Sequence, residues 1–330
     1  MKIVRLLAVF ALYALSMQIL ANSTSDLGSL GTPDIDDIEY PDDEEPSERE
    51  LELGKILFFD TRLSRHQNQS CATCHNPELG FSDGLANGIG SGGAILGRNA
   101  PHLYNLAWSV SFFWDGRAGS LEEQALGPLV SELEMQMTPK DVVKRLEEVK
   151  FYRDEFTHIY GEISFENVGK AIAAFERTIV SDNSAFDQYL AGNKSAMSPS
   201  AIRGLNVFVG KGRCTKCHDG ANFTDDSFHN IGIDNQDDGR FEFDKSVQFK
   251  GAFKTPGLRN IIMSAPYMHD GSLGTLEEVV EHYNQGAAGV KNVSPLIVPL
   301  NLSIQEKADL VAFMAALTDP VVVQRPSIPK

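Results

Sequence analysis

Apolar residues recur at helical spacing along much of the 330-residue chain, whereas stretches that alternate apolar and polar residues are sparse. One helical stripe consists of Val168, Ile172, Phe175 and Ile179, and the default role of such a stripe is core packing. Helix starts are indicated at Thr138-Pro139 and Ser198-Pro199, because a capping hydroxyl precedes a proline at the first helical position. We therefore predict a mainly α fold with long loops.

Two further helices are predicted by capping boxes, in which a hydroxyl and a glutamate three residues later exchange hydrogen bonds with the backbone. One box pairs Ser303 with Glu306, and the other pairs Thr275 with Glu278. The apolar face of the second helix consists of Leu276, Val279, Val280 and Tyr283. Tyr283 is therefore predicted to point inward, where a tyrosine most often belongs to the core.

The N-terminal residues have the pattern of an export signal. Residues 1–21 begin with two cations, continue with an apolar stretch that Ser16 and Gln18 interrupt, and end at Ala21. The apolar stretch is short for a membrane anchor, so cleavage is preferred over a single-pass tether. Residues 22–46 are rich in acid and poor in apolar surface, which predicts a disordered linker.

The remaining residues are sufficient for two domains, predicted over 47–192 and 193–330 with a boundary near Ala191-Gly192. No short-period repeat is evident. The formal net charge of −16 excludes nucleic acid as a natural partner and suits a basic electron-carrier protein, although it also serves solubility.

Two C-x-x-C-H runs carry the most specific chemistry of the chain. They are Cys71-Ala72-Thr73-Cys74-His75 and Cys214-Thr215-Lys216-Cys217-His218, and they use all four cysteines. This run is the attachment signature of c-type haem, in which both thiols bind the porphyrin and the histidine ligates the iron. We therefore predict one covalent haem in each domain and, because haem is attached in this way outside the cytoplasm, a bacterial periplasmic protein.

A zinc site and two disulfides are the alternatives. Paired zinc knuckles lie about 15–20 residues apart, whereas Cys74 and Cys214 are far more distant in sequence. Disulfides within each pair would leave His75 and His218 unexplained. Haem accounts for all six residues.

The chain resembles the bacterial di-haem cytochrome c peroxidases, including the MauG-type enzymes of methylamine utilisation, from about Leu51 to Leu317. Besides the haem motifs, the resemblance is carried by 58–60, 62–64, 97–101, 113–118, 123–128, 134–135, 174–178, 254–260 and 265–271. It implies two cytochrome c-like domains with one haem each.

The resemblance also implies roles at the first haem. His75 is expected to hold the iron that meets hydrogen peroxide, with Glu134 as the group that moves the peroxide proton and Gln124 as a distal-pocket residue. Trp114 is expected to lie between the haems. Without the resemblance, Glu134 would be read as a solvated loop residue and Trp114 as core.

Two positions depart from one branch of the family. A histidine that blocks the first iron in many members is replaced by Ser91, and His102 nearby is expected to be structural. At the second haem, a methionine ligand is replaced by Tyr283, the ligand type of the MauG branch. We predict that Tyr283 ligates this iron, with His269, His282 or a methionine as alternatives.

The resemblance further implies one calcium ion held by Asn99, Ser264 and Pro266, the last two through backbone carbonyls. The expected activity is reduction of hydrogen peroxide with electrons from a small redox protein, a cytochrome c or a cupredoxin, and a homodimer is compatible with it. A maturase that oxidises a partner protein and a non-catalytic di-haem electron-transfer protein are the alternatives.

Overall fold

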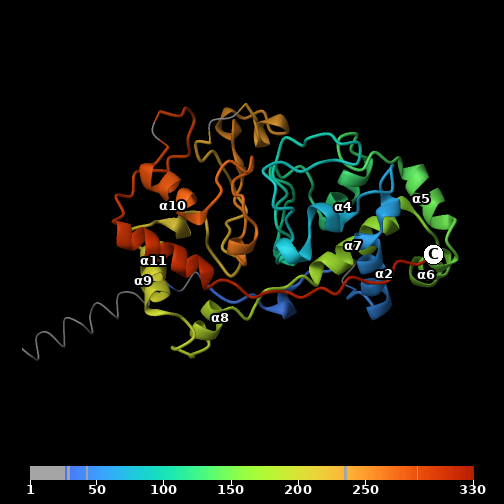
Figure 1. Cartoon of the computed structure of the whole chain (residues 1–330), viewed down its shortest axis with the longest axis horizontal. Coiled ribbons are helices and arrows are strands. Elements are labelled where there is room, and N and C mark those ends of the chain that lie inside the picture. Colours follow the sequence, from blue (N-terminus) through green and yellow to red (C-terminus); the bar gives the residue numbers. More distant parts are fainter. Residues whose placement is uncertain (1–26, 28–29, 42–43, 234–235, 288) are drawn as a thin grey trace, which may run out of the picture.

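The computed structural model describes residues 27, 30–41, 44–233, 236–287 and 289–330. The predicted signal at 1–21 lies outside the described residues. The described chain is mainly helical and forms two halves that lie side by side (Figure 1). Among the described helices, none combines the length and the apolar character that crossing a membrane requires.

The first half is a helical layer around one apolar core. Its helices are α2 (Glu48–Phe59), α3 (Cys71–Cys74), α4 (Leu121–Val130), α5 (Pro139–Glu147), α6 (Lys150–Tyr160) and α7 (Phe165–Arg177). Short 3₁₀ helices cover Ile35–Asp37, Thr61–Leu63, Pro77–Leu79 and Leu106–Trp108. The core gathers buried side chains such as Leu57, Phe58 and Tyr152.

The second half contains α8 (Ala185–Leu190), α9 (Pro199–Val209), α10 (Leu276–Gln285) and α11 (Ile304–Ala315). The strands β1 (Phe228–His229) and β2 (Phe253–Lys254) pair antiparallel. Its 3₁₀ helices cover Cys214–Lys216, Arg240–Glu242, Val247–Phe249 and Ile261–Met263. A second core cluster includes Phe186, Phe208 and Phe313.

Each half is built on one helix crossing that a glycine permits. In the first half, a Cβ on Gly54 of α2 would lie 1.8 Å from the carbonyl oxygen of Ala171 in α7. In the second half, a Cβ on Gly204 of α9 would lie 1.9 Å from the carbonyl oxygen of Asp309 in α11. No side chain fits at either position, so the two glycines fix the same kind of close packing twice.

The predicted helix starts are confirmed. Thr138 caps α5 and Ser198 caps α9, each with proline in the first turn. Capping boxes open α10 at Thr275 and α11 at Ser303. Helix α7 ends at Arg177, so Ile179 is buried beyond the helix that its spacing suggested.

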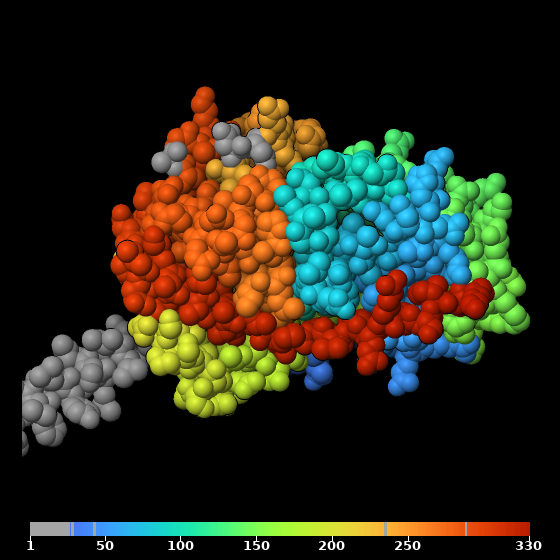
Figure 2. All heavy atoms as spheres, in the orientation of Figure 1, coloured from blue at the N-terminus to red at the C-terminus, as the bar shows by residue number. Residues whose placement is uncertain are grey.

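The structure differs from the predicted organisation at both ends of the chain. Leu30 packs in the core of the second half, and the carbonyl of Gly31 accepts a hydrogen bond from Arg259, so this part of the acidic lead is not a free linker. The segment after α11 crosses to the first half, where Val323 and Ile328 pack against its core (Figure 2). Both ends contain apolar residues that the opposite half buries.

Candidate functional site: two histidine-lined cavities

The first cavity has a volume of about 570 Å³ and is lined by His75, Trp114, Gln124, Pro128 and Glu134. His75 directly follows α3, and its Nδ1 lies 3.1 Å from the carbonyl oxygen of Phe81. Nδ1 therefore donates to this carbonyl, which leaves Nε2 as the ring nitrogen for a metal. Burial lowers the pKa of His75, so its imidazole is neutral, as ligation requires.

Helix α4 and the turn after it position the polar residues of this cavity. Ser120 caps α4, and Gln124 and Pro128 lie one turn apart on it. The turn then brings Glu134 to the cavity, with the N–H of the buried Met135 donating to the carbonyl of Pro128 at 3.1 Å. Gln124 and Glu134 are thus brought together beside His75.

The second cavity is smaller, about 180 Å³, and is lined by Cys214, Cys217, His218 and Tyr283. His218 repeats the arrangement of His75, with Nδ1 lying 2.9 Å from the carbonyl oxygen of Phe223. Burial lowers its pKa too. Each histidine therefore presents Nε2 as the remaining ring nitrogen, in the tautomer that an iron ligand requires.

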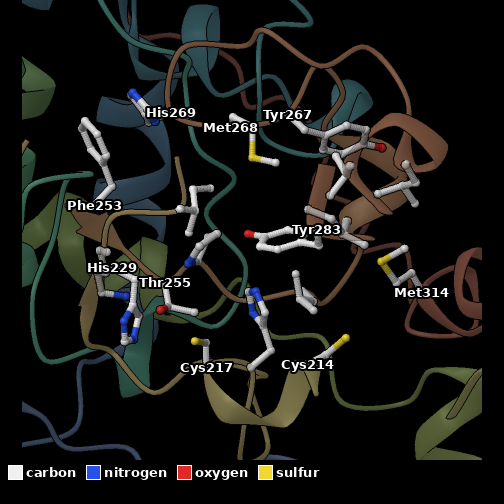
Figure 3. A pocket seen from close by; sticks show the side chains of 18 of the residues that line it. Cys214, Cys217, His229, Phe253, Thr255, Tyr267, Met268, His269, Tyr283 and Met314 are labelled. Atoms are coloured by element: carbon white, nitrogen blue, oxygen red, sulfur yellow. The ribbon is translucent and has the colours of Figure 1, made fainter. Parts of the chain in front are cut away.

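Tyr283 reaches into the second cavity from α10, and the Met268 side chain points into the same space (Figure 3). Burial raises the pKa of the Tyr283 hydroxyl, with the thiols of Cys217 and Cys214 as further causes. As a phenolate, this residue would therefore need a nearby cation, which a ferric ion would supply.

The histidine alternatives to Tyr283 have other contacts. His282 Nε2 lies 2.9 Å from the carbonyl oxygen of Ile231. The His269 ring stacks on Phe253, with the ring centroids 3.5 Å apart. Met268 and Met314 line the cavity and remain the methionine alternatives.

Trp114 and His102 line both cavities. Trp114 Nε1 donates to the carbonyl of Asn99 at 2.9 Å. The N–H of Tyr104 donates to His102 Nδ1 at 3.3 Å, so Nε2 carries the proton and donates to the carbonyl of Gly257 at 2.9 Å. His102 is therefore held by local hydrogen bonds.

The two halves meet with approximate two-fold symmetry. The N–H of Asn99 donates to the carbonyl of His269, and the N–H of Lys254 donates to the carbonyl of Trp114, both at 2.8 Å. Asn99 and Lys254 are 155 residues apart in sequence, as are Trp114 and His269. The two rings contact edge to face, with centroids 6.4 Å apart. Trp114 and His269 are thus equivalent residues facing each other.

Charged side chains reinforce this interface. Arg98 forms ion pairs with Asp115 of the first half and Asp237 of the second. Arg240 of the second half donates to the carbonyls of Asp115 and Gly116 at 3.0 and 2.6 Å. Because Trp114 precedes Asp115, the same contacts restrain the backbone of the tryptophan.

Comparison with known proteins identifies the family. The family described as di-haem cytochrome c peroxidase matches residues 48–195. The methylamine utilization protein MauG of Methylorubrum extorquens is 45% identical over 84% of this chain and 80% of its own. The cytochrome c551 peroxidase of Pseudomonas aeruginosa is 34% identical over 82% of this chain and 79% of its own.

The chain belongs to the di-haem cytochrome c peroxidase family. Its fold is that of the di-haem peroxidases: a solved MauG-like protein associated with microbial copper homeostasis superposes with a TM-score of 0.79, at 33% identity, over 85% of this chain and 92% of that one. The family implies two haems, and the two histidines, each with Nδ1 donating to a phenylalanine carbonyl, fit them.

The four cysteines are unpaired in this structure, which leaves both thiols of each motif available for attachment of a haem. Burial raises the pKa of Cys74 to about 11 and that of Cys217 to about 11. Among the described residues, the one group of potential metal ligands is Cys217, Asp225 and His229, and it shares Cys217 with the second haem motif.

The three residues expected to bind calcium line the second cavity, with Asn99 reaching it from the first half. Asn99 Nδ2 donates to the carbonyl of Leu85 at 2.7 Å, which directs its amide. The backbone carbonyl of Asn99 already accepts a hydrogen bond from Trp114 Nε1. Ser264 and Pro266 flank Ala265.

No role was assigned from the sequence to Pro128 or Arg98, although both lie in segments of the resemblance, and His269 and the methionines were considered only as alternative ligands. Pro128, Met268 and His269 line the cavities, and Arg98 connects the halves. The available signal is internal: residues 112–123 and 267–278 share Asp-Gly and Leu-Glu-Glu at matching positions. Aligning these two stretches would have paired Trp114 with His269.

Proposed function

We propose that this protein is a periplasmic di-haem peroxidase that reduces hydrogen peroxide to water. The observation that carries the proposal is the first cavity, where Glu134 and Gln124 lie in an open space of about 570 Å³ shared with His75. A protein that only passes electrons would not need a carboxylate and an amide in such a space. The family of peroxidases to which the chain belongs supports the same conclusion.

The four motif cysteines and the two motif histidines would hold the haems. When bound, the haems supply the iron at which the O–O bond is split and the capacity to hold its oxidising equivalents. Glu134 would accept a proton from the proximal peroxide oxygen and return it to the distal one, so that water leaves. The amide of Gln124 would donate to the peroxide and orient it.

Trp114 would lie on the path between the two haem sites, because it lines both cavities. Its indole N–H is held by the Asn99 carbonyl, and its backbone is held by Lys254. A fixed aromatic ring between the sites shortens each electron step. Tyr283, which lines the second cavity together with His218, would be a further protein ligand of the iron held there.

An external redox protein, a small cytochrome c or a cupredoxin, would return two electrons through the His218 haem. The net charge of −16 favours a basic donor and disfavours nucleic acid. We also propose one calcium ion at Asn99, Ser264 and Pro266, and export by the segment at 1–21. A homodimer is one assembly to test by sedimentation.

The test adds hydrogen peroxide to the fully ferric protein and then supplies reduced cytochrome c. Because Ser91 stands where a blocking histidine would lie, we expect the ferric spectrum to change at once and the cytochrome to be oxidised. A spectrum that stays unchanged until one haem is reduced would mean that another residue blocks the iron. Absence of peroxide consumption would favour a plain electron-transfer protein.

A second candidate is a maturase that oxidises a partner protein. It is favoured by Tyr283 in the second cavity and by the 45% identity to a methylamine utilization protein. The same assay distinguishes the two, since a maturase would react with peroxide but oxidise cytochrome c poorly. A neighbouring gene for a quinone-cofactor enzyme would favour the maturase.

A further inference from the structure

The loop over residues 88–96 folds back on itself beside the first cavity. An isolated bridge pairs Ile89 with Ile95, and the N–H of Gly90 donates to the carbonyl of Ala94 at 2.8 Å. Gly88 lines the cavity, whereas Ser91 is not among its lining residues and is only 5% exposed. Ser91 therefore does more than leave the iron unblocked: it is buried in contacts of its own.

Ser91 is bound twice by Asn68, three residues before the first haem motif. Its Oγ donates to Asn68 Oδ1 at 2.7 Å, and Asn68 Nδ2 donates to the Ser91 carbonyl at 3.1 Å. Gln69 Nε2 adds a hydrogen bond to the carbonyl of Ile89 at 2.5 Å. The loop is thereby tied to the segment that leads into Cys71.

On its other side, Ser91 holds the turn that carries Glu134. The N–H of Ser91 donates to the carbonyl of Glu134 at 2.7 Å. Gly90 lies so close to this turn that a Cβ there would fall 1.7 Å from the Leu133 carbonyl oxygen. Ser91 thus connects Asn68 to the backbone of Glu134 directly.

Apolar burial holds the loop only weakly. Ile89 is 45% exposed, Ile95 is 76% exposed, and Leu133 of the facing turn is 57% exposed, while Leu96 is half-buried at the edge of the cavity. A segment whose apolar side chains are largely exposed depends mainly on its hydrogen bonds for a fixed position. The two hydrogen bonds between Asn68 and Ser91 involve side chains, so mutation can remove this restraint on the loop selectively.

We propose that Asn68 and Ser91 form a latch that fixes the loop over residues 88–96 against the Glu134 turn and so positions Glu134 in the first cavity. The proposal rests on the proposed role of Glu134. Asn68 and Ser91 are positioning residues, since they act through the Glu134 backbone. The latch holds the loop in position without the contact to the iron that a histidine at position 91 would provide.

The test compares Asn68→Ala and Ser91→Ala with the unaltered holoprotein. Amide hydrogen exchange over 88–96 should speed up about tenfold in both variants, because the loop then opens locally. The kcat for peroxide should fall about tenfold with little change in KM, since a carboxylate displaced by about 1 Å loses rate more than binding. Asn68→Ala should have the larger effect, because it removes both side-chain hydrogen bonds.

Two further variants separate positioning from general damage. Ser91→Thr keeps the hydroxyl and should restore both exchange and kcat to within about twofold of the unaltered protein. Ser195→Ala removes a hydrogen bond of the same type, from Ser195 Oγ to Asn193 Oδ1 at 2.7 Å, in the exposed loop between α8 and α9. This control should leave exchange over 88–96 and kcat unchanged.

Unchanged exchange over 88–96 in Asn68→Ala would overturn the latch, as would an equal loss of kcat in Ser195→Ala. Faster exchange without any loss of kcat would overturn the positioning of Glu134. Hydrogen exchange does not depend on peroxide turnover. If the unaltered protein shows no peroxide reaction, the proposed function fails, while the exchange data still decide whether the latch exists.

Discussion

The two cavities share a local framework and differ in the space beside the histidine. In both, a neutral histidine donates Nδ1 to a phenylalanine carbonyl, at Phe81 in one and Phe223 in the other. The first cavity has about 570 Å³ of space and the second, which Tyr283 lines, about 180 Å³. The same histidine support is therefore combined with a large space in one half and with a small, tyrosine-lined space in the other.

One position on equivalent helices accounts for much of this difference. Helices α4 and α10 follow matching turns, with Gly116 and Gly271 at φ values of +65° and +63°. Both helices begin after a hydroxyl cap, and their eighth residues are Pro128 and Tyr283. The small ring of Pro128 takes up little space at the first cavity, whereas the long side chain of Tyr283 extends into the second.

One buried carboxylate in each half provides a second contrast. Asp187 of the second half is paired with Arg259 through two hydrogen bonds of 2.8 and 2.9 Å. Glu176 of the first half is 4% exposed, and its Oε2 has no hydrogen-bond partner in the described structure. Burial, with Glu122 as a further cause, raises the pKa of Glu176 to about 8. Burial thus favours the uncharged form of this acid in the first half.

The largest expected effect is at Glu134. Glu134→Gln keeps the size of the side chain but removes its ability to accept a proton, so peroxide turnover should fall by about 10²–10⁴-fold. Stopped-flow kinetics with peroxide measures this. The spectrum of the second haem should stay unchanged, because Glu134 lines only the first cavity. Loss of haem together with activity would instead make Glu134 structural.

Glu176 should make the stability of the protein depend on pH. Its pKa of about 8 exceeds the ordinary 4.5, so between these values the folded chain binds more protons than the unfolded chain. The free energy of unfolding should therefore fall as pH rises, by up to about 1.4 kcal/mol per pH unit, and level off above the folded pKa. Glu176→Gln should abolish this slope in denaturant unfolding measured from pH 5 to 9.

Asp187→Asn provides the contrast for that experiment. It leaves the buried Arg259 without its charge partner, so it should destabilise the fold at every pH in this range, by about 3–5 kcal/mol. If Glu176→Gln gives the same uniform loss, Glu176 is charged in the folded protein, and the contrast between the halves is wrong.

Pro128→Tyr should make the first cavity resemble the second. A tyrosine at this position adds bulk to the space beside His75 and so competes with any molecule that must enter it. The affinity of the ferric protein for cyanide should fall about tenfold or more. Unchanged affinity in a well-folded variant would show that the helix position does not decide which cavity is open.

Tyr283→Phe should have the smallest effect on the reaction with peroxide at the first cavity. At the second cavity it should change the spectrum of the haem. Removal of the hydroxyl deletes the proposed axial ligand, so the spin state of the second haem should change while its covalent attachment remains. Electron paramagnetic resonance checks this. An unchanged spectrum would assign Tyr283 to packing and leave His269, His282 or a methionine as the ligand.

The sequence by itself determined the local chemistry of this protein. The C-x-x-C-H runs, the capping boxes at Thr275 and Ser303, and the proline starts at 139 and 199 depend on neighbouring residues, and the structure contains each of those helices. The resemblance to the family was visible in the haem motifs together with the ordered short segments between Leu51 and Leu317. Local signals suffice here because caps and attachment motifs act within four or five residues.

Only the tertiary structure decided which distant residues meet. The pairing of Trp114 with His269, the binding of Ser91 by Asn68 and the burial of Leu30 in the opposite half join residues that carry no shared local signal. These contacts depend on how the two halves are packed against each other. That packing balances many small burial and hydrogen-bond terms, which no single stretch of sequence contains.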